Sequence, residues 1–206
     1  MRFLYVMDPM CSWCWAFAPV IDQLSNTYSD IPFDTVMGGL APDSDAPMPQ
    51  DLQQMISTTW RRIEQQTGTR FNHEFWQNCA PRRSTYPACR AVISAEQQQA
   101  GSSKAMIRAI QHAYYLQAQN PSDADTLIQL AEDLGLDRTT FTDQLYSEET
   151  EQLLQQHLRL AAEIGANGFP SLYLATNDDK LMPISLGYSD WTHVQRNLER
   201  YLQQEK

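Results

Sequence analysis

Two cysteines with two residues between them, Cys11 and Cys14, lie where one structural pattern changes into another. The apolar run before them, residues 3–7, is short and rich in aromatic and aliphatic side chains, which predicts a buried strand. After them, apolar residues recur with helical spacing at Phe17, Val20, Ile21, Leu24 and Tyr28. The cysteine pair is therefore expected at the first turn of a helix that directly follows a strand.

This position suits thiol chemistry for geometric and electrostatic reasons. Side chains three residues apart on a helix share a face, with Cβ atoms roughly 5–6 Å apart. A small adjustment brings them to the separation of about 3.8 Å that a disulfide prefers. The first helical turn also presents backbone N–H groups without intrahelical partners, at the positive end of the macrodipole, and these stabilise a thiolate. We therefore predict that Cys11 attacks a substrate disulfide and that Cys14, one turn further in, resolves the mixed disulfide.

A C-x-x-C pair can also hold zinc or form a structural disulfide. A zinc site needs a second pair of ligands at matching spacing, but nine residues separate the remaining cysteines, Cys79 and Cys89. A disulfide between residues as close as Cys11 and Cys14 constrains little of the unfolded chain. We therefore expect no metal and interpret the pair as a redox motif of the thioredoxin type.

Length and charge restrict the classes of partner. The 206 residues are enough for one good core, or for one domain that carries a large insertion. A formal net charge of −10 argues against nucleic acid or an anionic membrane as the main partner. No apolar run approaches the roughly 20 residues of a membrane span, and no secretory signal is visible. We therefore expect a cytoplasmic protein, in a compartment that keeps thiols reduced.

The two ends of the chain carry strand patterns. A strand over 2–7, a helix over 12–28 and a strand over 31–37 predict a right-handed parallel unit. Near the other end, two short apolar runs at 171–175 and 181–186 flank a turn and predict a hairpin. Pro183 lies within the second run and indicates an edge strand, and Asp190 is expected to cap a closing helix.

The middle of the chain is helical in pattern. A proline-rich loop at 41–49 precedes it, and apolar stripes at helical spacing continue to about residue 164. The expected helix caps are Ser102 or Ser103, Gly135, Asp137 and Ser147. We therefore expect one domain built from residues 1–45 and 165–206, with a helical insertion domain over 46–164.

This order of elements, with C-x-x-C at the first helix and Gly168-Phe169-Pro170 before the hairpin, resembles the DsbA-like branch of the thioredoxin superfamily. It is most similar to cytosolic FrnE-type members. The resemblance implies an α/β fold, a thioredoxin fold with a large all-helical insertion. It also implies that Cys11 and Cys14 are the nucleophilic and resolving cysteines and that Pro170 is the cis-proline facing them. The residue before that proline, here Phe169, would offer its backbone to an extended substrate peptide.

The resemblance implies a thiol–disulfide oxidoreductase or isomerase that acts on protein or peptide thiols and disulfides. Such an enzyme requires no organic cofactor, and glutathione is a candidate redox partner. The chain departs from DsbA in carrying Ser12-Trp13 where DsbA has Pro-His between the cysteines, and Phe169 is bulkier than the usual residue there. Because Trp13 supplies no charge that favours a thiolate, we predict a less oxidising couple than that of DsbA.

Two other functions fit the same pattern. Kappa-class glutathione transferases and hydroxychromene carboxylate isomerases resemble this architecture, but typically have a serine where this chain has Cys11. A peptide-binding holdase could use an apolar groove lined by tryptophans, for which the candidates are Trp13, Trp15, Trp60 and Trp76. Of these, Trp13 is the one expected to be exposed, whereas Trp15 and Trp60 also suit a core.

Cys79 and Cys89 form a second candidate site. Cys89 is expected in the first turn of a helix with arginines nearby in sequence, so the two thiols could form a second redox pair. The alternative is that they are ordinary buried or incidental cysteines, since this residue type is among the most often buried, and we prefer it. The four scattered histidines are expected to be structural or surface residues.

Overall fold

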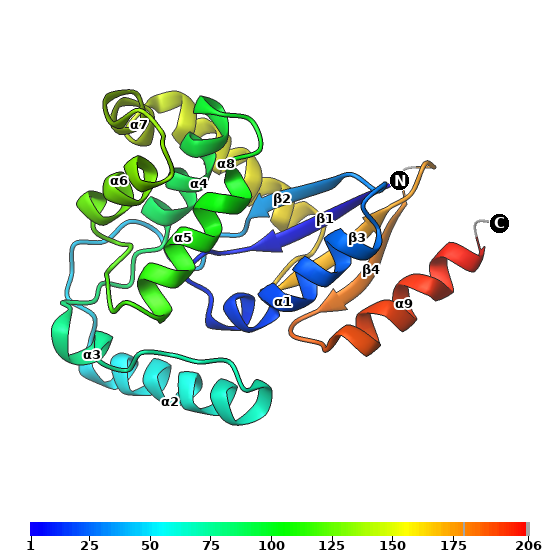
Figure 1. Cartoon of the computed structure of the whole chain (residues 1–206), viewed down its shortest axis with the longest axis horizontal. Helices are drawn as coiled ribbons and strands as arrows, with labels where there is room; N and C mark the ends of the chain where they lie inside the picture. Colours follow the sequence, from blue (N-terminus) through cyan, green and yellow to red (C-terminus); the bar gives the residue numbers. More distant parts are fainter. Residues whose placement is uncertain (179, 205–206) are drawn as a thin grey trace. The chain divides into compact units, whose positions relative to one another are not determined.

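The computed structural model describes residues 1–178 and 180–204. Its elements follow in the order β1 (Arg2–Met7), α1 (Ser12–Thr27), β2 (Phe33–Met37), α2 (Gln50–Thr67), α3 (Phe75–Asn78), α4 (Tyr86–Gln98), α5 (Ser103–Tyr115), α6 (Ala124–Asp133), α7 (Arg138–Leu145), α8 (Glu148–Glu163), β3 (Ser171–Ala175), β4 (Leu181–Leu186) and α9 (Trp191–Gln204) (Figure 1). The chain forms two compact units, Met1–Gly38 with His157–Lys206, and Gly39–Gln156. The domain limits expected from the sequence stay a prediction, because a compact unit need not fold alone.

The first unit is built around a sheet with the strand order β2-β1-β3-β4. β1 runs parallel to β2, with Phe3 opposite Phe33, and antiparallel to β3, with Tyr5 opposite Leu172. Figure 1 shows the blue strands from the start of the chain beside the orange strands from its end. The α/β class expected from the sequence is confirmed, with a long helical segment between the two halves of the sheet.

Helices cover both faces of this sheet. The ring of Tyr5 lies 6.1 Å from that of Phe17 on α1, whereas Val6 belongs to a buried cluster with Ala161 on α8. Successive side chains of a strand point to opposite faces, so α1 and the end of α8 pack on opposite sides of β1. α9 packs against β4 and α1, and its Leu198 is fully buried.

The hairpin of β3 and β4 forms as the sequence predicts. Its register places Tyr173 opposite Pro183, beside an irregularity between Leu172 and Tyr173. β4 is the outer strand of the sheet, which confirms the interpretation of Pro183 as an edge-strand residue. A proline has no N–H to donate, and only an outer strand tolerates that loss without breaking a ladder bond.

The second unit contains helices packed around α4, which contacts α5, α6 and α7. Its α4 stripe of small and aliphatic residues is buried as predicted, at Ala88, Ala91, Val92 and Ala95. Trp60 on α2 is fully buried and contacts the rings of Phe71, His73, Phe75, Trp76, Tyr114 and Tyr115. Trp60 is therefore a core residue and does not line a peptide groove.

Three of the predicted helix N-caps are confirmed. In each, a side-chain oxygen accepts the backbone N–H three residues later: Asp137 from Thr140 at 2.8 Å, Ser147 from Thr150 at 3.1 Å, and Asp190 from His193 at 2.9 Å. These oxygens satisfy N–H groups that the helix itself leaves unpaired. The local sequence was sufficient to predict these N-caps because the donor and the acceptor of each hydrogen bond are close in the chain.

The start of α5 forms differently from the prediction. Ser102 stands at the N-cap, but its side chain makes no capping bond. The carboxylate of Glu96, at the end of the preceding helix, accepts the N–H groups of Gly101 and Ser103 at 2.8 and 2.9 Å. The Glu96 carboxylate thus binds N–H groups at the positive end of α5, although not the ones that a capping Ser102 hydroxyl would accept.

His157 on α8 belongs to the first unit and meets the end of β2. The backbone N–H of Met37 donates a hydrogen bond to its Nδ1 at 3.2 Å, which requires a neutral ring with the proton on Nε2. Burial lowers the pKa of His157 from its usual value. The expectation of a structural histidine agrees with this contact.

We expect His157 to make stability depend on pH. Its folded-state pKa lies below the unfolded value of about 6.5, so the unfolded chain binds the proton more readily as pH falls below that value. Its contribution to the free energy of unfolding should be complete above about pH 6.5 and decrease progressively at lower pH. Urea unfolding from pH 7.5 to 5 should therefore show a shallower loss for His157→Gln than for the wild type. Equal slopes would contradict this role.

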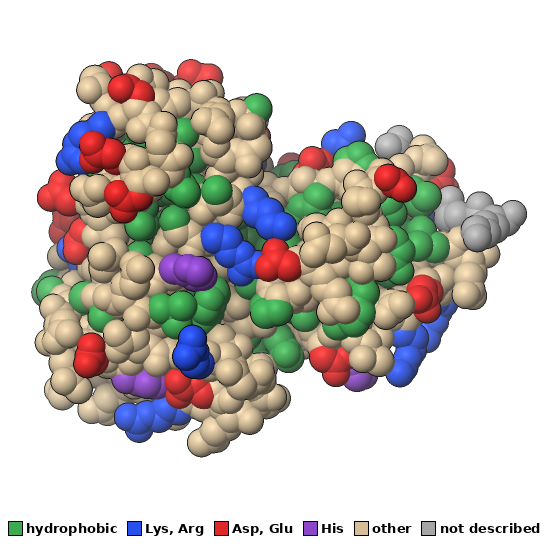
Figure 2. Space-filling model, viewed as in Figure 1, with side chains coloured by type: hydrophobic (Ala, Val, Ile, Leu, Met, Phe, Trp, Pro, Cys, Tyr) green, Lys and Arg blue, Asp and Glu red, His purple; other side chains and the backbone are tan. Residues whose placement is uncertain are grey.

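The surface carries charges of both signs. On the face shown in Figure 2, acidic and basic side chains are interspersed over both units. Isolated exposed ion pairs of this kind, such as Arg138 with Glu132 at 2.8 Å, contribute little to stability. Among the described residues, no helix has both the length and the apolar character required to cross a membrane.

Candidate active site

Cys11 occupies the N-cap of α1. Its backbone is extended, with φ −79° and ψ 115°, and its sulfur accepts the backbone N–H of Cys14 at 3.3 Å. The sulfur thus takes the place of the side-chain oxygen in an ordinary N-cap. Cys11 is 6% exposed and lies at the positive end of the helix, where the backbone favours negative charge on the sulfur.

Cys14 lies in the first turn of α1 and is fully buried. Burial raises the pKa of the Cys14 thiol well above its usual value, and the Cys11 sulfur and the Asp8 carboxylate raise it further. A hydrogen bond with the backbone of Asp8 acts in the opposite direction. Cys14 is therefore a protonated thiol at neutral pH, held behind a more accessible sulfur.

Asp8 shapes the turn that leads into the helix. Its carboxylate accepts the backbone N–H of Met10 at 2.8 Å, and its carbonyl accepts the N–H of Cys11 at 3.0 Å. This is the local hydrogen-bonding pattern by which Asp favours turns. Asp8 is fully buried, and its charge opposes ionisation of Cys14. Asp8 therefore does not activate this thiol, and its hydrogen bonds to Met10 and Cys11 indicate that it positions the turn.

Phe169 and Pro170 face the cysteines from the segment before β3. The peptide bond between them is cis, and the Cys11 thiol donates to the Phe169 carbonyl with an S···O distance of 3.6 Å. Pro170 is buried, and its carbonyl accepts the N–H of Gly187 at 2.7 Å. The two sequence motifs, 158 positions apart, therefore meet at one sulfur.

The Phe169 side chain has neighbours in the buried interior of the first unit. It packs against the buried cluster formed by Val6, Val36, Ala161, Ala166 and Tyr173. Phe169 is itself partly buried, so part of its bulk is accommodated against this cluster. Its carbonyl remains at Cys11.

Trp13, between the cysteines, is partly buried, whereas the sequence led us to expect an exposed side chain. Its ring lies 5.5 Å from that of Tyr188, which also contacts Phe17 at 6.2 Å. Tyr188 follows β4 in a turn at Gly187, whose φ of 88° is in the left-handed region. Tyr188 was not predicted as a site residue, because the sequence around it indicates only a turn at Gly187 and its ring partner, Trp13, is distant in the chain.

Cys79 and Cys89 lie in the second unit. Cys89 is fully buried in α4, and Cys79 is partly exposed and donates to the Ala118 carbonyl at 2.9 Å. Burial raises the pKa of the Cys79 thiol, and the Asp123 carboxylate adds to the shift. No disulfide joins them in this structure. The surroundings of Cys79 disfavour a reactive thiolate, and burial makes Cys89 inaccessible.

We expect this second pair to stay reduced. In a Cys11→Ser, Cys14→Ser double variant, oxidised glutathione should leave Cys79 and Cys89 as thiols, because a protonated or buried sulfur attacks slowly. Thiol labelling followed by mass spectrometry measures this. Formation of a Cys79–Cys89 disulfide would instead support a second redox pair.

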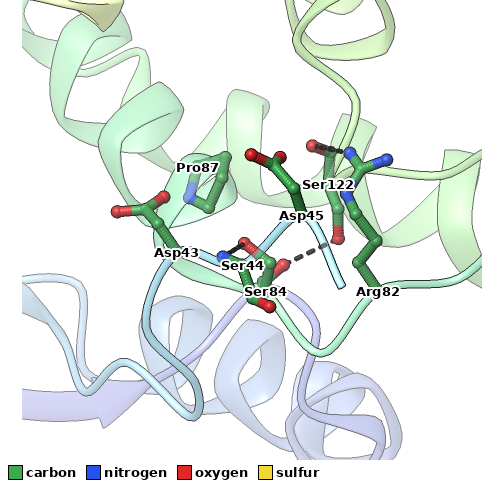
Figure 3. A pocket seen from close by; sticks show the side chains of 7 residues that line it. All are labelled: Asp43, Ser44, Asp45, Arg82, Ser84, Pro87 and Ser122. Atoms are coloured by element: carbon green, nitrogen blue, oxygen red, sulfur yellow. Dashed lines mark hydrogen bonds between the residues drawn. The ribbon is translucent and has the colours of Figure 1, made fainter. Parts of the chain in front are cut away.

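The second unit also has a polar pocket of about 240 Å³, lined by Asp43, Ser44, Asp45, Arg82, Ser84, Pro87 and Ser122 (Figure 3). The Arg82 guanidinium donates to the Ser122 carbonyl and the Asp123 carboxylate, both at 2.6 Å. The Ser122 hydroxyl donates to the Ser84 carbonyl at 2.7 Å. These polar groups mainly bind one another. Within residues 1–178 and 180–204, no three His, Cys, Asp or Glu side chains gather as metal ligands.

Comparisons with known proteins identify relatives of the whole chain. The sequence model of a family described as thioredoxin matches residues 3–187. A structure from Nitrosomonas europaea, provisionally described as a protein disulfide isomerase, is 30% identical, with a TM-score of 0.89 and coverage of 100% of this chain and 98% of that one. The cytosolic disulfide reductase DsbM from Pseudomonas aeruginosa has the same fold, at 24% identity, TM-score 0.79 and coverage of 98% and 99%.

A further relative has a different description. The ClpXP adapter protein SpxH of Bacillus subtilis is 25% identical over 186 residues, which are 89% of this chain and 62% of that protein. The chain thus spans about three fifths of the length of this relative. The family match includes both halves of the sheet, the C-x-x-C motif at Cys11 and the Gly168-Phe169-Pro170 motif that contacts it. The chain therefore belongs to the thioredoxin family.

Proposed function

We propose that this protein catalyses thiol–disulfide exchange on protein or peptide substrates through a Cys11–Cys14 cycle. The observation that carries the proposal is the position of the Cys11 sulfur, between the Cys14 N–H at 3.3 Å and the Phe169 carbonyl at 3.6 Å. The N–H donor and the positive end of the helix interact favourably with the negative charge that a sulfur carries when it attacks a disulfide. The relatives described as disulfide isomerase and disulfide reductase support the same chemistry.

The cycle moves two electrons from the protein to the substrate. The Cys11 thiolate attacks one sulfur of the substrate disulfide, forms a mixed disulfide and releases the other substrate sulfur as a thiolate. Cys14 then gives its proton to that leaving thiolate or to water and attacks the Cys11 sulfur. The Cys11–Cys14 disulfide forms, and the second substrate thiolate leaves. Two molecules of a small thiol such as glutathione would restore the dithiol and become glutathione disulfide.

The raised pKa of Cys14 fits this order of events. A buried, protonated Cys14 does not compete with Cys11 for the substrate. Formation of the mixed disulfide removes any charge on Cys11, and with it one of the contributions that oppose ionisation of Cys14. The second sulfur therefore becomes a better nucleophile after the first has reacted.

Substrate binding is assigned to Trp13, Phe169 and Pro170. The backbone before Pro170 would pair with an extended substrate segment, as in strand addition, and the partly buried Trp13 ring would contact its apolar side chains. We further propose that the protein works in the reducing cytoplasm and reduces or isomerises disulfides there, using glutathione and no bound cofactor.

The test is a redox titration combined with an exchange assay. Equilibration with glutathione buffers should place the Cys11–Cys14 couple below DsbA in potential, and the protein should accelerate glutathione-dependent reduction of a peptide disulfide. The Cys14→Ser variant should accumulate a mixed disulfide on Cys11, visible by mass spectrometry. Absence of both acceleration and mixed disulfide would refute the proposal.

Two alternatives give different results in the same variants. A glutathione-dependent isomerase or transferase, suggested by a hydroxychromene carboxylate isomerase with the same fold, should keep its activity in Cys14→Ser. A holdase or an adapter, the latter suggested by the description of SpxH, should keep peptide binding when both cysteines are serine. The exchange enzyme should lose its cycle in both variants.

A further inference from the structure

Gly38 lies at the end of β2 and has a neighbour that leaves no space for a side chain. A Cβ on Gly38 would lie 2.1 Å from Cε1, 2.2 Å from Cζ and 2.9 Å from Cδ1 of the Phe169 ring. Such separations are far below the van der Waals contact of about 3.5–4 Å between carbon atoms. The ring of Phe169 thus rests directly on the Gly38 backbone.

Both partners of this contact are held in place. The N–H of Gly38 donates to the Met7 carbonyl at 2.7 Å, which ties Gly38 to the end of β1. The Phe169 ring has the cluster around Val6 and Tyr173 against it, and these two residues are 0% and 4% exposed. Interiors are close-packed, so a ring that is pushed towards this cluster would have to displace core side chains.

Of three hydrogen bonds at the carbonyls of residues 168–170, the one from the Cys11 thiol to Phe169 is the weakest. On the two sides of Phe169, the Ser171 hydroxyl donates to the Gly168 carbonyl at 2.7 Å, and the Gly187 N–H donates to the Pro170 carbonyl at 2.7 Å. The Phe169 carbonyl is contacted by the Cys11 thiol at 3.6 Å. A thiol is a weak donor, so this contact yields before the two stronger ones.

We propose that Gly38 is a positioning residue for the redox site: by leaving room for the Phe169 ring, it fixes the Phe169 carbonyl against the Cys11 sulfur. The proposal rests on the function proposed above. A methyl group at position 38 would push the ring and, through it, the Phe169 peptide. The Cys11 thiol would then lose its acceptor, and the dithiol form would lose stabilisation relative to the disulfide.

The expected effect of Gly38→Ala is a shift of the equilibrium with glutathione towards the disulfide by about threefold, the scale of a weak net hydrogen bond. Gly168→Ala is the matched control. It adds the same methyl group next to Phe169, but nothing lies within 4 Å of its Cβ and its φ lies outside the positive range. Its equilibrium constant should stay within about 1.5-fold of the wild type.

A size exchange tests the contact itself. Leucine lacks Cε1 and Cζ, the two ring atoms nearest to the added methyl group, so Gly38→Ala with Phe169→Leu should return the equilibrium constant towards the wild-type value. Phe169→Leu alone leaves space over Gly38 and should shift the constant in the same direction as Gly38→Ala, but less. That single variant also provides the test if Gly38→Ala does not fold.

The outcomes separate this inference from the proposed function. The positioning role alone would be overturned if the wild-type protein cycles but Gly38→Ala leaves the equilibrium constant with glutathione unchanged or shifts it towards the dithiol. It would also be overturned if Gly168→Ala shifts this constant as much as Gly38→Ala does. A wild-type protein that fails to exchange disulfides would overturn the proposed function, whatever the variants do. A purely structural role of Gly38 would lower the melting temperature without moving the glutathione equilibrium.

Discussion

Cys11→Ser is expected to lower the rate of disulfide exchange by at least about 10³-fold, the scale on which loss of a nucleophile acts. Only a thiolate forms the mixed disulfide, and a serine hydroxyl neither ionises nor exchanges under the same conditions. The fold should survive, because Cys11 is an N-cap residue and serine is a favoured N-cap that can accept the Cys14 N–H. Glutathione-dependent reduction of a peptide disulfide measures the rate, and thermal unfolding checks the fold.

Cys79→Ser is the matched control for this prediction. Like Cys11, the Cys79 thiol donates to a backbone carbonyl, that of Ala118, but Cys79 is partly exposed, lies in the second unit and is not at a helix N-cap. Its replacement should leave the exchange rate within about twofold, since no sulfur of the cycle changes. If Cys11→Ser keeps residual exchange activity and that activity disappears when Cys79 is also replaced, Cys79 in the second unit would be a reacting thiol, which contradicts the prediction.

Trp60→Ala should lower the free energy of unfolding by about 3–5 kcal/mol, the usual cost of truncating a buried large aromatic residue. Trp60 is fully buried, and its ring lies 4.9 Å from Trp76 and 5.1 Å from Phe71. Its removal leaves a cavity that several rings border at once, so they cannot all collapse into it. Guanidinium unfolding followed by far-UV circular dichroism measures the change.

Tyr146→Ala provides the comparison. Tyr146 is also an aromatic residue of the second unit, but 68% of its surface is exposed, so its truncation should change stability by no more than about 0.5 kcal/mol. Trp60→Phe keeps part of the packing and should lie between the two. Equal losses for Trp60→Ala and Tyr146→Ala would mean that the aromatic cluster does not support the fold.

Local sequence patterns predicted the elements whose interactions are short in the chain. The hairpin of β3 and β4 followed from two apolar runs with a turn between them, and Pro183 placed its second strand at the edge. Asp137 capped its helix as expected because the donor lies three residues away. Ser102 makes no capping bond with its side chain, and the Glu96 carboxylate of the preceding helix instead accepts the N–H groups of Gly101 and Ser103, a contact that the sequence around Ser102 does not signal.

The candidate site was predictable in its chemistry and less so in its contacts. The C-x-x-C spacing at a strand–helix junction identified Cys11 and Cys14, and their roles stay predictions until the variants are measured. The partly buried position of Trp13 depends on Tyr188, which is distant in the chain. The importance of Gly38 depends on the Phe169 ring, and no local pattern at either residue indicates the other.

The sequence by itself determined the order of strands and helices and the redox motif, because these follow from periodicity, caps and spacing within a few residues, and the resemblance carried by that order and its two motifs implied the class of fold. The tertiary structure alone decided the environment of each sulfur: the burial of Cys14 and Asp8, the Phe169 carbonyl at Cys11, and the ring on Gly38. The reason is physical. Desolvation and close packing depend on which distant segments fill the space around an atom, and that is settled only when the whole chain has folded.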